Sequence, residues 1–415
     1  MEETPVAQRH QIISTVVALA ATLAAVAIPA GAAAPSAPPG TPRLVGQRAI
    51  EIPGARIISM SPDGHWLAAV RPVSRFERGS LCAIDIETLA DRACADLSVL
   101  GAGLRIEDVT WSPDSAHLAF AERGFVTFVD GDLWLMDAAT GALTNLDDDG
   151  FDGGLPLFKG VWPAGPITLP VNPAFSPDGS TIAFSRSILT PDARSNVIAT
   201  VPVSGGPVTD LVTVSRDQMG IAYNGIAWAP DATRIYYTAI SVRAADLSNG
   251  VWVVGADGND PHLLVGHYQD TSGPAVLDVS SDGATLLLQD PAAMGSFGSG
   301  LPVYATADTT HGIPTPILTL APGALPGATV GWAGFSPDGR WLLTVDRLLD
   351  PENQVRLRAL GATEDVALLP DGLAAAGPVA QGIAMTWAAN GTVLLTGAGR
   401  VETATLLTIE GGSAP

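Results

Sequence analysis

Short apolar segments recur along the chain, and each one follows a polar turn of nearly constant sequence. The turns begin at residues 61, 112, 176, 229, 280, 336 and 388, and most read Ser-Pro-Asp-Gly or a close variant. The apolar segments that follow span residues 65–70, 116–120, 180–185, 233–238, 284–289, 340–345 and 392–397. Each is short enough for a β-strand and apolar on both faces, as inner strands of stacked sheets are. Successive turns begin between 51 and 64 residues apart, and strand-rich repeats of about 50 residues are typical of a β-propeller.

The chemistry of the turn explains its composition. Proline presets the backbone angle φ of the second position, aspartate accepts hydrogen bonds from nearby amides, and glycine adopts a left-handed conformation. A single active site does not need one copy in every repeat, so we interpret the repeated aspartates as structural. They are Asp63, Asp114, Asp178, Asp231, Asp282 and Asp338.

Further strand-like segments complete each repeat. The first six repeats offer a third and a fourth strand, whereas the seventh offers only a third before the chain ends. Residues 43–51 read as a strand without a repeat of its own. We therefore predict an all-β fold with a single propeller of seven four-stranded blades, in which residues 43–51 join the last blade and close the ring. Six or eight blades stay open as alternatives, because the seventh turn, residues 388–391, is degenerate.

The Ser-Pro-Asp-Gly turn followed by an apolar strand resembles the propeller repeats of the TolB family, which are similar to WD40 repeats. The resemblance covers residues 43–412. It implies a propeller that serves as a periplasmic interaction protein, although TolB also has an N-terminal domain for which this chain has no room. Similar propellers accompany a hydrolase domain in prolyl-oligopeptidase-type enzymes, and lyases built on propellers use histidine-based metal sites. No separate hydrolase domain and no convincing set of three histidines is recognisable here.

The chain carries a large negative charge. Asp and Glu number 42 against 21 Lys and Arg, which gives a formal net charge of −21. Such a charge repels phosphate backbones, so nucleic-acid binding is not expected. It favours solubility and attracts cations or basic partners.

The N-terminus has the features of an export signal. Residues 12–28 carry no charge, Pro29 follows them, and Ala30-Gly31-Ala32 offers small residues at a cleavage site. We predict a signal peptide over residues 1–32, a proline-rich linker over 33–42 and an extracytoplasmic location. The alternative is a membrane anchor that retains residues 12–28.

Cys82 and Cys94 are the two cysteines of the chain, and their spacing is no zinc pattern. Both fall in one predicted hairpin and face each other across its strands. In an oxidising compartment this arrangement predicts a disulfide. Two unpaired buried thiols are the alternative.

An acidic stretch lies in a long insertion, residues 147–173, between the second and third repeats. Asp147, Asp148, Asp149 and Asp152 surround a glycine. Closely spaced carboxylates of this kind could hold Ca²⁺, which prefers oxygen ligands. A solvated acidic loop is the alternative.

Arginines gather in the loops between the second and third strands of the repeats, which share one face of a propeller. Their guanidinium groups recognise carboxylates and phosphates in a bidentate manner. They are candidates for an anionic-ligand site at the mouth of the channel, with local ion pairing as the alternative. The candidates are Arg71, Arg123, Arg186, Arg243, Arg347 and Arg400.

These observations favour a monomeric, non-enzymatic binding module for a protein or glycan partner, which requires no cofactor apart from the calcium hypothesis. The chain contains no recognisable nucleophile elbow, zinc-protease motif or phosphate-binding loop. Two alternatives stay open. One is a secreted hydrolase or lyase with its site at the channel mouth, and the other is a membrane-anchored sensor domain.

Overall fold

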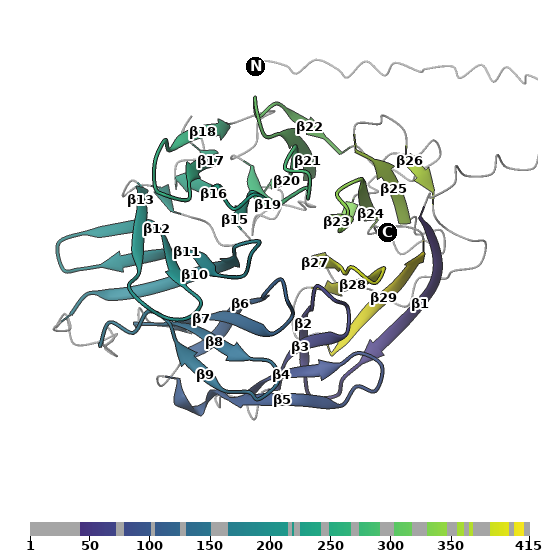
Figure 1. Cartoon of the computed structure of the whole chain (residues 1–415), viewed down its shortest axis with the longest axis horizontal. Coiled ribbons are helices and arrows are strands. Elements are labelled where there is room, and N and C mark those ends of the chain that lie inside the picture. Colours follow the sequence, from purple (N-terminus) through teal and green to yellow (C-terminus); the bar gives the residue numbers. More distant parts are fainter. Residues whose placement is uncertain are drawn as a thin grey trace, which may run out of the picture. The chain divides into compact units, whose positions relative to one another are not determined.

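The strands of the chain form a ring of sheets in a computed structural model (Figure 1). The ring belongs to the compact unit Gly40–Pro415. The structure describes residues 42–71, 79–100, 104–124, 130–150, 165–214, 218–219, 225–241, 249–266, 274–290, 303–317, 330–346, 355–360, 365–367, 382–397 and 402–410.

The first three blades each contain four antiparallel strands in chain order, from the centre outward. Blade 1 consists of β2 (Arg56–Met60), β3 (Trp66–Arg71), β4 (Ser80–Asp85) and β5 (Asp91–Asp96), followed by the 3-10 helix η1 (Leu97–Val99). Blade 2 consists of β6 (Leu104–Trp111), β7 (His117–Gly124), β8 (Leu133–Asp137) and β9 (Leu143–Asn145). Blade 3 consists of β10 (Ile167–Phe175), β11 (Thr181–Leu189), β12 (Arg194–Pro202) and β13 (Thr209–Val214).

The next three blades repeat this order. In blade 4, β14 (Gln218–Met219) and β15 (Ile226–Trp228) both pair with β16 (Arg234–Ser241), followed by β17 (Gly250–Gly255) and β18 (His262–Val265). Blade 5 consists of β19 (Ala275–Val279), β20 (Thr285–Asp290), β21 (Val303–Asp308) and β22 (Pro314–Pro316). Blade 6 consists of β23 (Val330–Phe335), β24 (Trp341–Asp346), β25 (Val355–Ala359) and β26 (Asp365–Ala367).

The last blade joins the two ends of the propeller. It contains β27 (Gly382–Trp387), β28 (Thr392–Gly397) and β29 (Thr403–Glu410), and the N-terminal strand β1 (Arg43–Glu51) is its outermost strand. β1 pairs antiparallel with β29, from Arg43 opposite Glu410 to Glu51 opposite Thr403. This pairing confirms the prediction of seven blades closed by residues 43–51, and it protects a strand edge that would otherwise be free.

The repeated turn owes its shape to a serine and an aspartate. In blade 1 the buried Ser61 hydroxyl donates to Asp63 and accepts from the Trp66 amide at 2.9 Å. The Asp63 carboxylate also accepts from the His65 amide at 3.0 Å. Gly64 has a φ of +76°, which favours glycine. The same aspartate contacts recur in the other turns, which supports the structural interpretation of Asp114, Asp178, Asp231, Asp282 and Asp338. We call the side of the ring with these turns the lower rim, and the opposite side the upper rim.

The core lies between neighbouring blades. The second strands are buried on both faces, as Leu67 and Ala68 in β3 illustrate, each 0% exposed. Ala68 packs toward Trp111 and Phe120 of blade 2, in one apolar cluster. Each blade therefore stabilises the next by burial of apolar surface.

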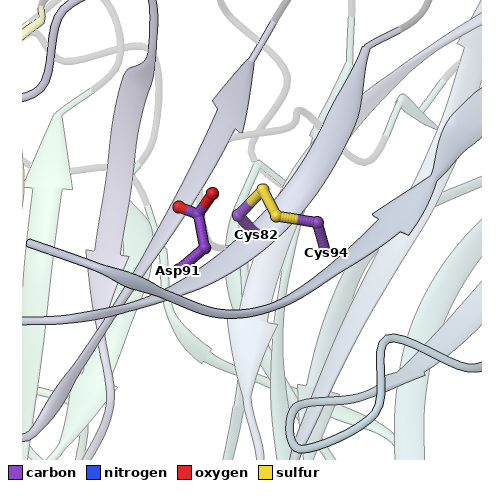
Figure 2. Close-up of side chains that lie close together, drawn as sticks. All are labelled: Cys82, Asp91 and Cys94. Atoms are coloured by element: carbon purple, nitrogen blue, oxygen red, sulfur yellow. A yellow bond between two sulfur atoms is a disulfide. The ribbon is translucent and has the colours of Figure 1, made fainter.

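The predicted disulfide between Cys82 and Cys94 is present, and its two residues lie opposite each other on β4 and β5. Figure 2 shows Asp91 next to the sulfur atoms. Because the sulfurs are bonded to each other, this group is a cross-link and not a metal site.

The predicted signal segment 1–32 and most of the linker lie outside the described residues. Among the residues that are described, no helix is long and apolar enough to span a membrane.

Candidate functional site

Five carboxylates lie at the upper rim of blade 2. Glu122 comes from the upper end of β7, and Asp130 and Asp132 flank Gly131 just before β8. Asp147 and Asp149 follow β9 directly. Three strands of blade 2, with the residues next to them, thus supply all five side chains. We call these five residues the carboxylate cluster.

A glycine allows this close approach. A Cβ atom on Gly131 would lie 2.8 Å from the Glu122 carbonyl oxygen, which is too short for any other residue. The Gly131 amide also donates to the Thr168 carbonyl at 2.9 Å, at the start of β10. Gly131 therefore allows the segment before β8 to lie against both Glu122 and the start of β10. This segment carries the buried Asp130 and Asp132.

Backbone and side-chain donors orient the cluster. Asp130 accepts from the Thr168 amide, and Asp149 accepts from the Thr168 hydroxyl at 3.4 Å. Asp147 accepts from the Leu133 amide through Oδ1. At the edges of the cluster, the Asn145 amide donates to Asp132 at 2.8 Å and the Trp134 indole donates to Glu122 at 2.8 Å.

Burial makes the charged state of this cluster costly. Glu122 is 3% exposed, Asp130 4% and Asp132 8%. Burial raises the pKa of Asp130 to about 8, the Thr168 amide opposes that rise, and the charges of Asp149 and Asp132 add to it. Asp130 therefore keeps its proton to a higher pH than an exposed aspartate does.

Asp147 has the second perturbed carboxyl group. Burial raises its pKa to about 7, although the Leu133 amide and the nearby Arg186 favour the charged form. Its Oδ2 atom is shut off from solvent and accepts no hydrogen bond within the described part of the chain. This oxygen is a buried acceptor available to a ligand.

The structure places the predicted calcium residues in different surroundings. Asp147 is partly buried within the carboxylate cluster and Asp149 is an exposed member of it, whereas Asp148 is exposed and accepts from the Gly150 amide at 2.8 Å. Asp152 lies outside the described residues. In the described ranges, no three of the cluster's oxygen atoms lie close enough together to surround an ion without rearrangement.

Sequence reasoning missed Glu122, Asp130, Asp132 and the role of Thr168. The spacing Asp130-Gly131-Asp132 was the available signal, because a glycine between two acids permits a tight approach. A second signal was the alternation Asn145, Asp147, Asp149 before Gly150, which resembles the start of a calcium-loop pattern but has Asn in place of its first Asp. Gly150 has a φ of +79°.

Two of the predicted arginines are described with their side chains, and each is bound within its own blade. Arg71 contacts Asp91 at 2.6 Å in blade 1, and Arg186 contacts Asp210 in blade 3. These ion pairs match the alternative of local pairing for these two residues. Arg123 lies in β7 opposite Arg105, and its side chain is outside the description. Arg243, Arg347 and Arg400 lie outside the described residues.

The fold and this site define a seven-bladed β-propeller with a partly buried carboxylate cluster on its upper rim. No family model matches the sequence, and no curated protein matches it either. Solved structures with the same architecture do exist, and they cover most of the propeller.

An oligogalacturonate lyase from Vibrio parahaemolyticus is similar with a TM-score of 0.52 and 10% identity, over 89% of this chain and 98% of that one. The β-propeller domain of Cps50 (Swd1) from Myceliophteria thermophila gives 0.50 and 11%, over 89% and 99%. A TolB-type protein from Agrobacterium tumefaciens gives 0.41 and 16%, over 65% and 81%. Likeness at these identities establishes the fold alone, and the folds serve both binding proteins and enzymes.

Proposed function

We propose that the protein is an exported, monomeric, non-enzymatic binding module that holds a protein or glycan partner on its upper rim, around blades 2 and 3. The carboxylate cluster carries this proposal. Buried like charges destabilise a fold, and a group of them at one rim is typical of a site kept for binding. The buried serines of the repeated turns, such as Ser112 and Ser176, are by contrast satisfied within their own turns.

Calcium is the ligand that we propose for the cluster itself. Ca²⁺ takes six to eight oxygen ligands, and carboxylates are its preferred protein donors. Asp130, Asp132, Asp147 and Asp149 offer such oxygens, and the free Oδ2 atom of Asp147 lacks any other partner among the described residues. Burial is the main cause of the raised pKa of Asp130, and a bound ion would stabilise its buried charge and offset the repulsion from Asp149 and Asp132.

Isothermal titration calorimetry with CaCl₂ and then MgCl₂ tests the ion. We expect a Kd for calcium of about 0.1–1 mM, as in extracellular calcium modules, and weaker binding of magnesium. The double variant Asp130→Asn/Asp147→Asn should lose the calcium heat, whereas Asp192→Asn, an exposed upper-rim control, should keep it. Calcium binding by the double variant with the same affinity as the wild type would contradict the proposed site.

A glycan microarray and a panel of purified exported proteins test the partner, each probed with CaCl₂ and with EDTA. We expect at least one ligand whose binding weakens about tenfold in the double variant and is unchanged in Asp192→Asn. Ligands that bind all three proteins equally would place the binding surface away from the upper rim.

One observation favours an enzyme as the second candidate. A carboxyl group with a pKa near neutrality is the property of a general acid, and Asp130 and Asp147 both have it. A secreted hydrolase or lyase would turn over a glycan that the array identifies, and Asp130→Asn would abolish turnover. Binding without turnover supports the binding module.

A further inference from the structure

A second site lies on the lower rim, between blades 3 and 4. It is a cavity of about 350 Å³ between the lower ends of β11, β12 and β13 and the Trp228 side chain of blade 4. This volume lies within the range of small-molecule sites. The residues that the argument uses are Asp178, Ser180, Thr181, Thr200, Thr209 and Trp228.

The same position between blades 1 and 2 is filled. Trp66 of blade 1 occupies the position that Thr181 has in blade 3, because each residue follows its turn by the same number of positions. Trp66 packs with Trp111 and Trp134 in one apolar cluster. Arg92 covers the Trp66 ring at 4.3 Å from its centroid.

Only Thr181, in place of Trp66, makes room in blade 3. Thr200 replaces Ala83 on the third strand and Thr209 replaces Ala93 on the outermost strand, so each adds a hydroxyl group. Thr200 and Thr209 lie directly opposite each other in the sheet. Blade 5 has threonines at the same three positions, but the residue before the next turn there is Phe335 instead of a tryptophan.

The hydroxyls are available to a ligand. Thr200 is 9% exposed and Thr209 is exposed, and neither hydroxyl forms a hydrogen bond with any described residue. A hydroxyl both donates and accepts, so both can bind polar groups of a ligand.

The charges of the other residues that line the cavity limit the charge that a ligand can carry. The Asp178 carboxylate already accepts from Ser176 and twice from Ser180, so it is occupied by its own turn. Its pKa is lowered by the hydrogen bonds from Ser176 and Ser180. Among the described residues that line the cavity none is basic, which disfavours an anion.

Trp228 supplies an apolar surface in a fixed orientation. Its indole nitrogen donates to the Ala174 carbonyl of blade 3 at 3.0 Å, and the residue is partly exposed. An indole ring packs well against a flat, weakly polar face of a ligand.

We infer that this cavity binds a neutral sugar unit, which presents hydroxyls to Thr200 and Thr209 and its C–H face to Trp228. The site is independent of the upper-rim proposal, because no cluster carboxylate lines it.

Saturation-transfer NMR with glucose, galactose, mannose and N-acetylglucosamine tests the site, followed by calorimetric titration of any binder. We expect at least one sugar to bind. In Thr200→Val/Thr209→Val, which keeps the side-chain shape and removes both hydroxyls, affinity should fall about tenfold or more. The control is Thr306→Val/Thr315→Val, which makes the same changes at the matching positions of blade 5 and should bind like the wild type.

Three outcomes overturn the inference. They are no binding of any of these sugars to the wild type, equal binding by the Thr200→Val/Thr209→Val variant, or equal loss in the blade 5 control. The Asp130→Asn/Asp147→Asn variant should bind the sugar normally, so failure at one rim is distinguishable from failure at the other.

Discussion

Asp114 and Asp130 belong to the same blade but lie on opposite rims, and their surroundings have opposite effects. On the lower rim, the Ser112 hydroxyl donates to Asp114 and lowers the pKa of its carboxyl group. On the upper rim, burial and neighbouring acids raise the pKa of Asp130 to about 8. The comparison shows that the residue type does not determine the role. An aspartate surrounded by donors stabilises the fold in its charged form, whereas burial beside other acids favours the protonated form of an aspartate.

The largest expected effect concerns the lower rim. Ser112 is buried, and its hydroxyl donates to Asp114 and accepts from the His117 amide. Ser112→Ala removes both hydrogen bonds. We expect a loss of about 1–3 kcal/mol in the free energy of unfolding, measured by urea denaturation. Ser281→Ala, at an exposed position of the blade 5 turn, should change it by less than about 0.5 kcal/mol. Equal losses of unfolding free energy in the two variants would contradict a special role of the buried turn serine.

The pH dependence of stability should distinguish the two rims. Asp130 and Asp147 have folded pKa values of about 8 and about 7, above the unfolded value near 4. Their contribution is therefore full below about pH 4 and is lost as the pH rises to about 8. Lower-rim aspartates such as Asp114 have lowered pKa values, so their contribution is present above about pH 4 and lost below it.

In EDTA, we therefore expect the free energy of unfolding to decline between pH 5 and pH 8, as the two folded carboxyl groups lose their protons. Denaturation at several pH values measures it. The slope should flatten in Asp130→Asn/Asp147→Asn, which separates the cluster from the general repulsion of a chain with net charge −21. An unchanged slope in that variant would assign the effect to net charge alone.

A smaller effect is expected at Arg186, whose charge acts on Asp147. Its charge lowers the pKa of Asp147, so Arg186→Gln should steepen the decline with pH and strengthen the preference for a bound proton. The matched control is Arg71→Gln, which breaks the equivalent ion pair in blade 1. Each pair is worth about 0–1 kcal/mol in itself. If both variants changed the slope alike, Arg186 would have no specific influence on the cluster.

The fold followed from the sequence because its signals are local. A turn such as residues 61–64 is held by hydrogen bonds within its own short segment. Because the turn recurs once in each repeat, its copies give the number of blades. The closure by β1 was also predictable, because the last repeat lacked a fourth strand and residues 43–51 belonged to no repeat of their own.

The site was only partly predictable, because it is assembled from separate segments. Asp147 and Asp149 stood out as an acidic run, but Asp130 joins them only through Thr168 of the next blade. The lower-rim cavity had no signal at all, because it depends on which residue of one blade faces Trp228 of another. Contacts between blades decide these features, and a single sequence does not display them.

The most direct test of the account compares one substitution on the two rims. The free energy of unfolding is measured for Asp130→Asn and Asp114→Asn at pH 8 in EDTA. We predict opposite signs: Asp130→Asn stabilises the protein, because it removes a buried charge, and Asp114→Asn destabilises it by about 1 kcal/mol, because it weakens the turn. Destabilisation by both substitutions would contradict the claim that the upper-rim carboxylates are held at a cost to the fold.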